Sequence, residues 1–348
     1  MKWICFYADS AYMNDALFDR ASRMNRDDCL SPFILLRDRL SAKGYECHTQ
    51  DRLDRDGGPP AAIAFVEMPR PRILRELSTA YPGVPLILFL FECEVIKPDN
   101  WREELFGYFK LVFTWKDSYV DGKKYHKIRF PVRFPDNVPA DGPQRERMFT
   151  MISANKSKTH PLELYSERRA LIEWFETFQP ENLDLYGIGW DRPSFSSQFL
   201  NRIIGILPSA ITSLFARKYK VYRGPIALKL PVLSKYRFAF CYENAKGIPG
   251  YITEKIFDGF FAGCVPVYMG ASDIREHIPA SCFIDKEAFP STGAAVKFMN
   301  GLTEKEYSAY LENIRRFLNT PEARAFSDVH FSDTVSKVIS DALPNSNA

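Results

Sequence analysis

Residues 238–270 read FAFCYENAKGIPGYITEKIFDGFFAGCVPVYMG, and this stretch indicates how the chain folds. Residues 238–242 and 265–269 are apolar runs of strand length, and residues 253–262 between them predict a helix. A strand, a helix and a second strand in this order are typical of a parallel sheet whose strands are joined by crossover helices. We therefore expect a parallel α/β fold in this part of the chain.

The same alternation of strands and helices runs through the rest of the chain. The other predicted strands are 2–8, 61–66, 84–91, 111–114, 125–130, 149–153 and 183–186, and the other predicted helices are 31–43, 72–80, 166–178 and 303–318. The proline-bearing stretch 134–143 interrupts the alternation and is the predicted linker. We expect two Rossmann-like domains at 1–142 and 143–328, and a C-terminal tail at 329–348 that packs back on the first domain.

Composition narrows the class of protein. The 348 residues are 46% hydrophobic, and 46 Lys and Arg against 43 Asp and Glu leave a net charge of +3. Such a balanced chain has no overall charge to attract nucleic acid, so we expect no nucleic-acid partner. The seven cysteines lack the spacing of a metal site, and no apolar run approaches the roughly 18–20 residues of a membrane span. These features predict reduced thiols and a cytoplasmic protein with no transmembrane span.

The start of the predicted helix at 253 has the features of a phosphate-binding site. Free N–H groups at a helix start attract anions, and Gly247 and Gly250 allow the preceding backbone to approach a ligand closely. Lys255 places a positive charge in the first turn, where it opposes the helix dipole, so function explains it better than stability. The tripeptide Thr-Glu-Lys at 253–255 is weak evidence by itself, because the same tripeptide recurs at 303–305, where an ordinary helix is predicted to start.

The segments YEN (242–244) and PGYITEKIFDGFFAGCVPVYMG (249–270) resemble the nucleotide-sugar signature of the α-1,3-fucosyltransferase family. The resemblance extends from about residue 65 to about residue 285. It implies a GT-B fold, in which two Rossmann-like domains face each other across a cleft, with the acceptor on the N-terminal side and the nucleotide on the C-terminal side. It also implies inverting transfer from GDP-fucose with no obligatory metal or other cofactor.

The resemblance assigns donor-binding roles to individual residues. Tyr251, Glu254 and Lys255 match positions that hold the nucleotide sugar, and Asn244 matches an asparagine near the donor. The family's diphosphate-binding arginine lies at the start of a helix early in the second domain, where Arg168 fits best and Arg169 is one step away. A guanidinium suits a diphosphate because it makes two charge-assisted hydrogen bonds. Weaker candidates near the nucleotide are Glu243, Gly250, Thr253, Tyr222 and Arg223.

The predicted general base lies in the first domain. Phe91-Glu92-Cys93-Glu94 follows the most apolar predicted strand, where ligands bind in α/β sheets. This segment resembles the family's acidic Glu-x-Pro segment, although Cys93 and Glu94 replace its usual small residue and proline. We favour Glu92 as the base, with Glu94 as the alternative.

Other motifs support other interpretations less well. Residues 54–56 read Asp-Arg-Asp, the metal signature of another glycosyltransferase fold, but we interpret them as a solvated turn. The five histidines show no ligand spacing, and we predict no metal site. Residues 201–223 run from apolar to basic, which favours a packed segment and leaves weak peripheral contact with the inner face of a membrane as the alternative.

The sequence therefore predicts an inverting, metal-independent glycosyltransferase of glycan biosynthesis. It would move L-fucose from GDP-β-L-fucose to a hydroxyl of an oligosaccharide or lipid-linked glycan, with α-1,3 linkage to a GlcNAc-type sugar. The first alternative is the same fold with another nucleotide sugar. The second is a non-catalytic protein that binds nucleotides or glycans.

Overall fold

The computed structural model describes residues 2–53, 58–135, 145–191, 206 and 218–343. The chain divides into two compact units. Unit 1 consists of Met1–Phe134 together with Pro321–Ala348, and unit 2 consists of Pro135–Thr320. Each unit contains one parallel sheet, so the predicted α/β class with two Rossmann-like domains is confirmed.

Unit 1 is built on a six-stranded parallel sheet with strand order β2-β1-β3-β4-β5-β6. The strands are β1 (Lys2–Tyr7), β2 (Tyr45–Thr49), β3 (Ala62–Val66), β4 (Leu86–Leu90), β5 (Leu111–Thr114) and β6 (Tyr125–Lys127). The helices are α1 (Ser31–Ser41), α2 (Pro71–Ala80), α11 (Pro321–Arg324) and α12 (Asp328–Ala342). The order of the strands reverses between β1 and β3, and ligands of such sheets bind at the carboxyl ends of the strands at that point.

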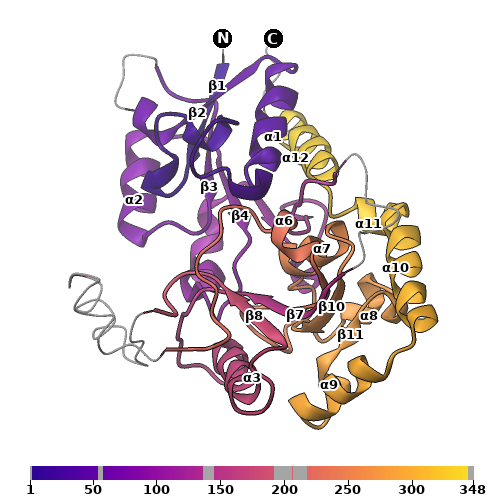
Figure 1. The fold of residues 1–348 in the computed structure, drawn as a ribbon. Coiled ribbons are helices and arrows are strands. Elements are labelled where there is room, and N and C mark those ends of the chain that lie inside the picture. Colours follow the sequence, from indigo (N-terminus) through magenta and orange to yellow (C-terminus); the bar gives the residue numbers. More distant parts are fainter. Residues whose placement is uncertain (1, 54–57, 136–144, 192–205, 207–217, 344–348) are drawn as a thin grey trace. The chain divides into compact units, whose positions relative to one another are not determined.

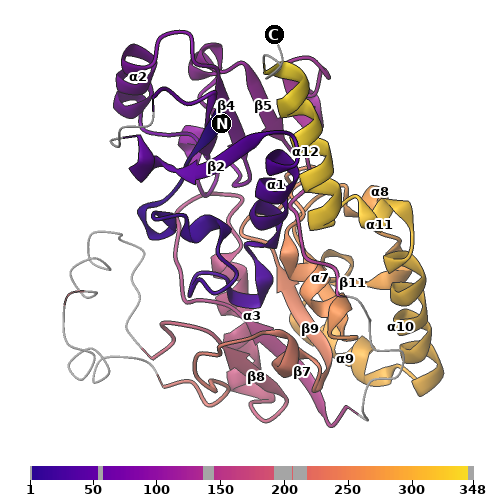
Figure 2. The same ribbon diagram turned by 90° about the horizontal axis from the view of Figure 1, so that it is seen from above.

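Both faces of this sheet are covered. Alternate residues of β4 point to opposite faces, so Ile87 and Phe89 pack with α1 and α12, and Leu86, Leu88 and Leu90 join a second core with Leu74 of α2. Figures 1 and 2 both show α12, in yellow, beside the indigo α1. The last helix of the chain therefore completes a core that the first residues begin.

The boundary predicted at 328/329 differs from this division, which assigns residues 321–328 to unit 1. The reason is a short backbone pairing with Val132. The Val132 N–H donates to the Phe326 carbonyl at 2.8 Å, and the Asp328 N–H donates to the Val132 carbonyl at 2.9 Å. The boundary predicted at 142/143 lies outside the described residues, and the division falls after Phe134.

Unit 2 contains a five-stranded parallel sheet with strand order β11-β10-β9-β7-β8. The strands are β7 (Arg147–Ile152), β8 (Leu183–Tyr186), β9 (Tyr236–Tyr242), β10 (Val265–Met269) and β11 (Ile284–Asp285). Among the described residues of unit 2, the helices are α3 (Tyr165–Phe178), α6 (Leu230–Leu233), α7 (Glu254–Phe261), α8 (Ile274–His277), α9 (Thr292–Gly301) and α10 (Glu304–Leu318). Here the order reverses between β7 and β9, so the carboxyl ends of these two strands mark the expected ligand site of unit 2.

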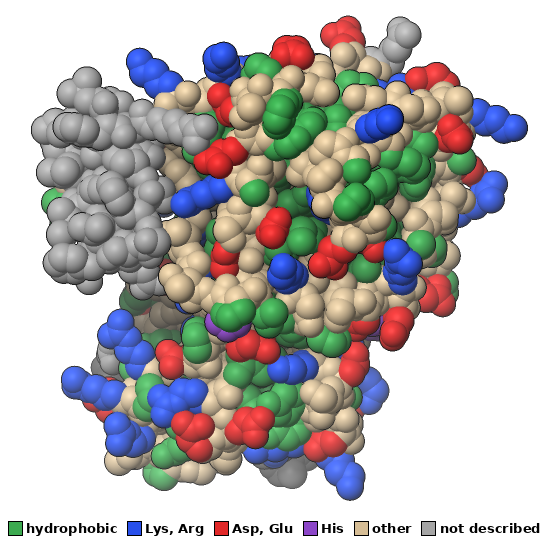
Figure 3. Space-filling view, turned by 90° about the horizontal axis from the view of Figure 1, so that it is seen from below, with side chains coloured by type: hydrophobic (Ala, Val, Ile, Leu, Met, Phe, Trp, Pro, Cys, Tyr) green, Lys and Arg blue, Asp and Glu red, His purple; other side chains and the backbone are tan. Residues whose placement is uncertain are grey.

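The surface agrees with the balanced composition. On the face shown in Figure 3, acidic and basic side chains are interspersed. No helix in the described part of the chain combines the length and the apolar character that crossing a bilayer requires. Most of the segment 201–223 lies outside the described residues, so its predicted packing is not described here.

Candidate functional site

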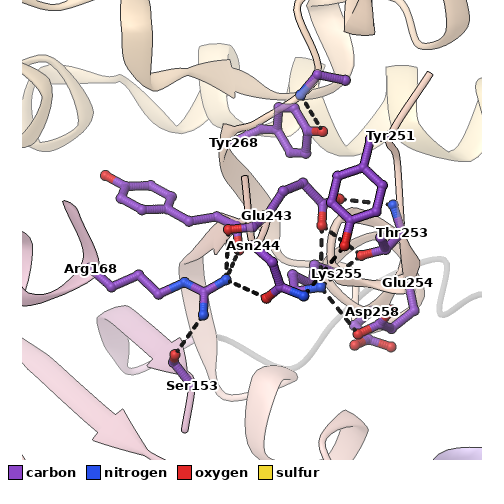
Figure 4. A network of polar contacts seen from close by, with 12 residues as sticks. Ser153, Arg168, Glu243, Asn244, Tyr251, Thr253, Glu254, Lys255, Asp258 and Tyr268 are labelled. Carbon is purple, nitrogen blue, oxygen red and sulfur yellow. Dashed lines mark hydrogen bonds and ion pairs between the residues drawn. The ribbon is translucent and has the colours of Figure 1, made fainter. Parts of the chain in front are cut away.

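Most of the predicted donor residues lie together at the point where the strand order of unit 2 reverses. Glu243 and Asn244 follow β9 directly, and Ser153 follows β7. The Asn244 carbonyl accepts a hydrogen bond from the N–H of Leu164 at 3.1 Å, just before α3 begins. This backbone contact holds the first turn of α3, which carries Arg168, against the end of β9. Figure 4 shows the Arg168 side chain beside Glu243 and Asn244.

Arg168 is buried, and its guanidinium binds the chain at the end of β9. One nitrogen donates to the carbonyls of Tyr242 and Glu243, both at 2.7 Å, and to Asn244 Oδ1 at 3.1 Å. The other terminal nitrogen donates to Ser153 Oγ at 3.3 Å. Burial lowers the pKa of Arg168 from its ordinary value, and this is the usual effect of removing a cation from water. The guanidinium thus connects the ends of β7 and β9.

Glu243 is fully buried and organises the start of α7. Its carboxylate accepts hydrogen bonds from the Thr253 N–H at 2.8 Å and the Thr253 hydroxyl at 2.7 Å. Lys255 Nζ lies 3.2 Å from the same carboxylate and donates to the Thr253 hydroxyl at 2.8 Å. Glu243 therefore fixes both the helix start and the ammonium group of Lys255.

Glu254 lies between two lysines. Its carboxylate is 3.5 Å from Lys255 Nζ and 3.8 Å from Lys229 Nζ, which also pairs with Asp258 at 2.7 Å. Burial opposes ionisation of Glu254, but the two ammonium groups outweigh it and lower its pKa to about 2. Burial likewise favours neutral Lys255, but the carboxylates of Glu243 and Glu254 raise its pKa. Glu254 and Lys255 therefore both stay charged at neutral pH.

Tyr251 and Gly250 shape the loop before α7. Tyr251 is buried, and its hydroxyl accepts a hydrogen bond from Asn244 Nδ2 at 3.4 Å. Gly250 has φ +77°, which favours glycine, and its N–H donates to Asp273 Oδ1 at 2.8 Å. Gly270 leaves room for Glu243, because a Cβ at Gly270 would lie 2.5 Å from the Cγ of that glutamate.

Two weaker candidates and the alternative arginine lie outside this network. Arg223 pairs with Asp184 of β8 at 2.5 Å, and the Tyr222 hydroxyl donates to the Gly187 carbonyl at 2.8 Å. Arg169 donates to Asn155 Oδ1 at 3.1 Å. The structure thus places the polar contact of Arg223 within β8 and that of Tyr222 directly after β8, and their position near the nucleotide stays a prediction.

No three His, Cys, Asp or Glu side chains are grouped to hold a metal ion in the described parts of the chain. The Asp-Arg-Asp sequence at 54–56 begins a segment that lies outside the described residues.

The predicted bases follow β4 in unit 1. Glu92 is partly buried, and its carbonyl accepts a hydrogen bond from Trp101 Nε1 at 3.2 Å. Glu94 Oε1 lies 3.4 Å from Lys116 Nζ. The other carboxylate oxygen of Glu94 is buried and has no hydrogen-bond partner among the described residues.

Sequence reasoning missed Glu67, the first residue after β3. Its φ of +77° is unusual for a residue with a long side chain, and its carboxylate accepts the N–H of Glu92 at 2.9 Å. Its place after a buried strand at the reversal of strand order was the available signal.

Comparison with known proteins identifies the part of the chain that carries the resemblance. Residues 213–336 match the C-terminal part of glycosyltransferase family 10, the fucosyltransferases. The chain resembles family 10. The match contains Asn244, Tyr251, Glu254 and Lys255, whereas Arg168 and both predicted bases lie before it.

Curated relatives support the same resemblance over short segments. The chain is 32% identical over 95 residues to the α-(1,3)-fucosyltransferase FucT of Helicobacter pylori. The matched segment covers 27% of this chain and 20% of that relative. It is 36% identical over 84 residues to the mouse 4-galactosyl-N-acetylglucosaminide 3-α-L-fucosyltransferase 9. This second match covers 24% of this chain and 23% of that relative. These matches span about a fifth of each relative.

Solved structures match the chain over almost its full length. An α1,3-fucosyltransferase with GDP-fucose has a TM-score of 0.56 at 14% identity, covering 100% of this chain and 94% of the other. Anabaena HepE with UDP-glucose has a TM-score of 0.57 at 12% identity, covering 98% of this chain and 100% of the other. At these identities the likeness concerns the fold, and it confirms the predicted GT-B class.

Proposed function

We propose that this protein is a glycosyltransferase that moves L-fucose from GDP-β-L-fucose to a hydroxyl group of a glycan. The observation that carries the proposal is the pair Arg168 and Lys255, two cations that meet the end of β9 and the start of α7 where the strand order reverses. Two cations and a helix start suit the diphosphate of a nucleotide sugar. The resemblance to family 10 and to relatives named as fucosyltransferases supports GDP-fucose as the donor.

The proposed chemistry is a single displacement with inversion. A carboxylate takes the proton of the acceptor hydroxyl as its oxygen attacks the anomeric carbon, and the bond from that carbon to the diphosphate breaks. Arg168, Lys255 and the start of α7 stabilise the negative charge that develops on the leaving GDP. These groups supply the positive charge without an obligatory metal, so a chelator should leave the rate unchanged. The proposed acceptor is an oligosaccharide or lipid-linked glycan with a GlcNAc-type sugar, joined by an α-1,3 linkage.

We propose Glu92 as the base, with Glu94 as the alternative. A base needs an oxygen that the acceptor hydroxyl can reach, and the one oxygen of Glu94 without a hydrogen-bond partner among the described residues, Oε2, is buried. The other oxygen of Glu94 lies 3.4 Å from Lys116 Nζ, which competes for it. We expect Glu92→Gln to lower kcat by at least about 100-fold, because general-base catalysis contributes about 10²–10⁴. Glu94→Gln is the matched control, and a large loss of kcat confined to Glu94→Gln would make Glu94 the base.

The donor assignment is tested by binding. GDP-fucose at 100 times its dissociation constant should stabilise the protein by ~2.7 kcal/mol in thermal unfolding. UDP-glucose and other nucleotide sugars form the comparison, because HepE has a similar fold and was solved with UDP-glucose. Stabilisation by a UDP-sugar and not by GDP-fucose would contradict the donor assignment. Binding of GDP-fucose without formation of any fucosylated product would favour the alternative of a non-catalytic binding protein.

The role of Lys255 is tested with a control that the chain itself offers. Lys255→Met should weaken GDP binding by at least tenfold, which corresponds to ~1.4 kcal/mol, because it removes a cation from the proposed diphosphate site. Lys305→Met changes the same tripeptide at the start of α10, where Lys305 is exposed, and should leave affinity unchanged. Isothermal titration with GDP measures both. Equal affinities for the two variants would contradict the proposed role of Lys255.

The proposed location is the cytoplasm. The seven cysteines are free thiols, and six of them are buried, which suits a reducing compartment. Cell fractionation would test this location, and recovery in the membrane fraction would favour the peripheral contact through 201–223.

A further inference from the structure

The chain immediately after β4 is held by side chains. The N–H groups of Phe91 and Glu92 both donate to Glu67 Oε1, at 3.3 and 2.9 Å. A single carboxylate oxygen at the end of β3 therefore binds two successive backbone amides at the end of the neighbouring strand.

Side chains also bind the two carbonyls of the same residues. The Phe91 carbonyl accepts from Trp115 Nε1 at 2.9 Å. The Glu92 carbonyl accepts from Asn100 Nδ2 at 3.1 Å and from Trp101 Nε1 at 3.2 Å. All four backbone polar groups of Phe91 and Glu92 thus have side-chain partners, an arrangement that we name the 91–92 clamp. Its members are Glu67, Asn100, Trp101 and Trp115.

Asn100 fixes the second oxygen of Glu67. The side chain of Asn100 is fully buried, and its Nδ2 donates to Glu67 Oε2. Its Oδ1 accepts the Met68 N–H at 2.9 Å, so the amide cannot turn over without losing that bond. Asn100 therefore presents a donor to Glu67 and a donor to Glu92 at the same time.

Glu67 occupies this place at a cost. Its φ of +77° lies in the left-handed region that side chains rarely adopt, and its side chain is partly buried. A glycine or asparagine would end the strand with less strain. Strained residues cluster at functional sites, and this one lies at the carboxyl end of β3, where the strand order of unit 1 reverses.

We infer that Glu67 is a positioning residue that fixes the backbone carrying Glu92 and Glu94 through the 91–92 clamp. This inference rests on the proposed function, in which one of those two glutamates is the base. Glu67 is not itself the base, because both of its oxygens already accept hydrogen bonds within the clamp.

Glu67→Gln tests the clamp with little change in shape. The glutamine oxygen can still accept the two backbone amides, but its NH₂ group meets the NH₂ group of Asn100, and two donors cannot bond. We expect kcat to fall at least tenfold, with the KM for the donor and the affinity for GDP within twofold of the wild type. Glu76→Gln is the control, since Glu76 is an exposed glutamate of α2 paired with Arg72.

The pH profile supplies a readout that a purely structural role would not move. Burial raises the pKa of Glu67 to about 7, the Glu92 carboxylate also raises it, and the Glu92 amide, Lys97 and Asn100 lower it. Protonation turns one oxygen into a donor that opposes Asn100. The kcat of the wild type should therefore decline as pH falls through about 7, and Glu67→Gln should lack that decline.

Amide hydrogen exchange at Phe91 and Glu92 measures the clamp without any substrate. Exchange at least tenfold faster in Glu67→Gln, together with the loss of kcat, supports the inference. Exchange or kcat equal to that of Glu76→Gln overturns it. If Glu67→Gln does not fold, Trp101→Phe replaces it, because this variant removes one hydrogen bond of the clamp. Faster amide exchange together with a lower kcat again supports the inference, and values equal to those of Glu76→Gln overturn it. If the wild type transfers no sugar, the proposed function fails by that result, and exchange alone decides for or against the clamp.

Discussion

Buried charge is the feature that marks the candidate site at the scale of single residues. Arg168 is 6% exposed and Glu243 is 0% exposed, and an unpaired charge in such surroundings would be strongly destabilising. Arg168 donates to backbone carbonyls at the end of β9 and to Asn244. Glu243 accepts from Thr253 and pairs with Lys255. Because every charge has fixed partners, the cations are held in place before a ligand arrives.

Glu67 gives a prediction about stability and pH at this scale. Its pKa rises from 4.5 to about 7 on folding, so the folded state binds this proton more tightly than the unfolded state. Its contribution to the free energy of unfolding is therefore complete below pH 4.5 and is lost as pH rises through about 7. The difference in unfolding free energy between wild type and Glu67→Gln should change by up to about 3 kcal/mol between pH 4.5 and pH 8. Urea unfolding at several pH values measures it, and a constant difference would contradict the raised pKa.

The repeated tripeptide shows how far residue-level prediction reaches. Thr303 forms a capping box with Glu306 and begins an ordinary helix, whereas Thr253 makes no such cap and binds Glu243. Lys255 could be selected from its glycine-bearing loop, but its partner Glu243 was only a weak candidate. The contacts of Glu67 could not be predicted, because its partners Glu92 and Asn100 are 25 and 33 residues away in the sequence.

At the scale of elements, strands with continuous apolar runs were predictable and one-sided elements were missed. The predicted strand at 265–269 matches β10, and the predicted helix at 303–318 matches α10 within one residue. The edge strand β2 was missed although alternate residues of it are buried, a pattern that indicates a strand. Helix α12 was missed although its buried residues Phe331, Val335 and Ile339 recur every four positions, a spacing that indicates a helix.

The contact between the ends of β7 and β8 gives the prediction for elements. Gly187 has φ +132°, and a Cβ there would lie 2.0 Å from the Ser153 carbonyl oxygen. Gly187→Ala should therefore separate the two strand ends and lower the free energy of unfolding by more than about 2 kcal/mol. Gly301→Ala is the control, because a Cβ at the end of α9 meets no atom within 4 Å, and it should stabilise by about 0.5–1 kcal/mol. Similar unfolding free energies for both variants would contradict the close approach.

At the scale of the whole molecule, unit 1 is formed by the two ends of the chain. The sequence predicted boundaries at 142/143 and 328/329 and a tail that packs back on the first domain, but local patterns carry no information about the pairing of Val132 with residues 326–328. Such a pairing joins residues 195 positions apart, Val132 and Ser327, and only the folded structure reveals it. Ser31 Oγ also donates to Asp328 Oδ2 at 2.5 Å, so the starts of α1 and α12 are joined directly.

The discontinuous core predicts that α12 stabilises unit 1 and leaves donor binding alone. Phe331 is 3% exposed, and its ring centre lies 5.9 Å from that of Phe33 and 6.1 Å from that of Phe89. Phe331→Ala should therefore lower the free energy of unfolding by about 3–5 kcal/mol, the usual cost of removing a buried phenylalanine ring. Its affinity for GDP at low temperature should stay within twofold, because Arg168 and Lys255 belong to unit 2.

Val329→Ala is the matched control on the same helix, since Val329 is 47% exposed and its truncation should cost less than about 0.5 kcal/mol. Urea unfolding and GDP titration of both variants separate the two properties. Equal unfolding free energies for the two variants would show that α12 does not complete the core. A large loss of GDP affinity in Phe331→Ala under conditions where the protein is folded would show that donor binding depends on unit 1, which the location of Arg168 and Lys255 does not predict.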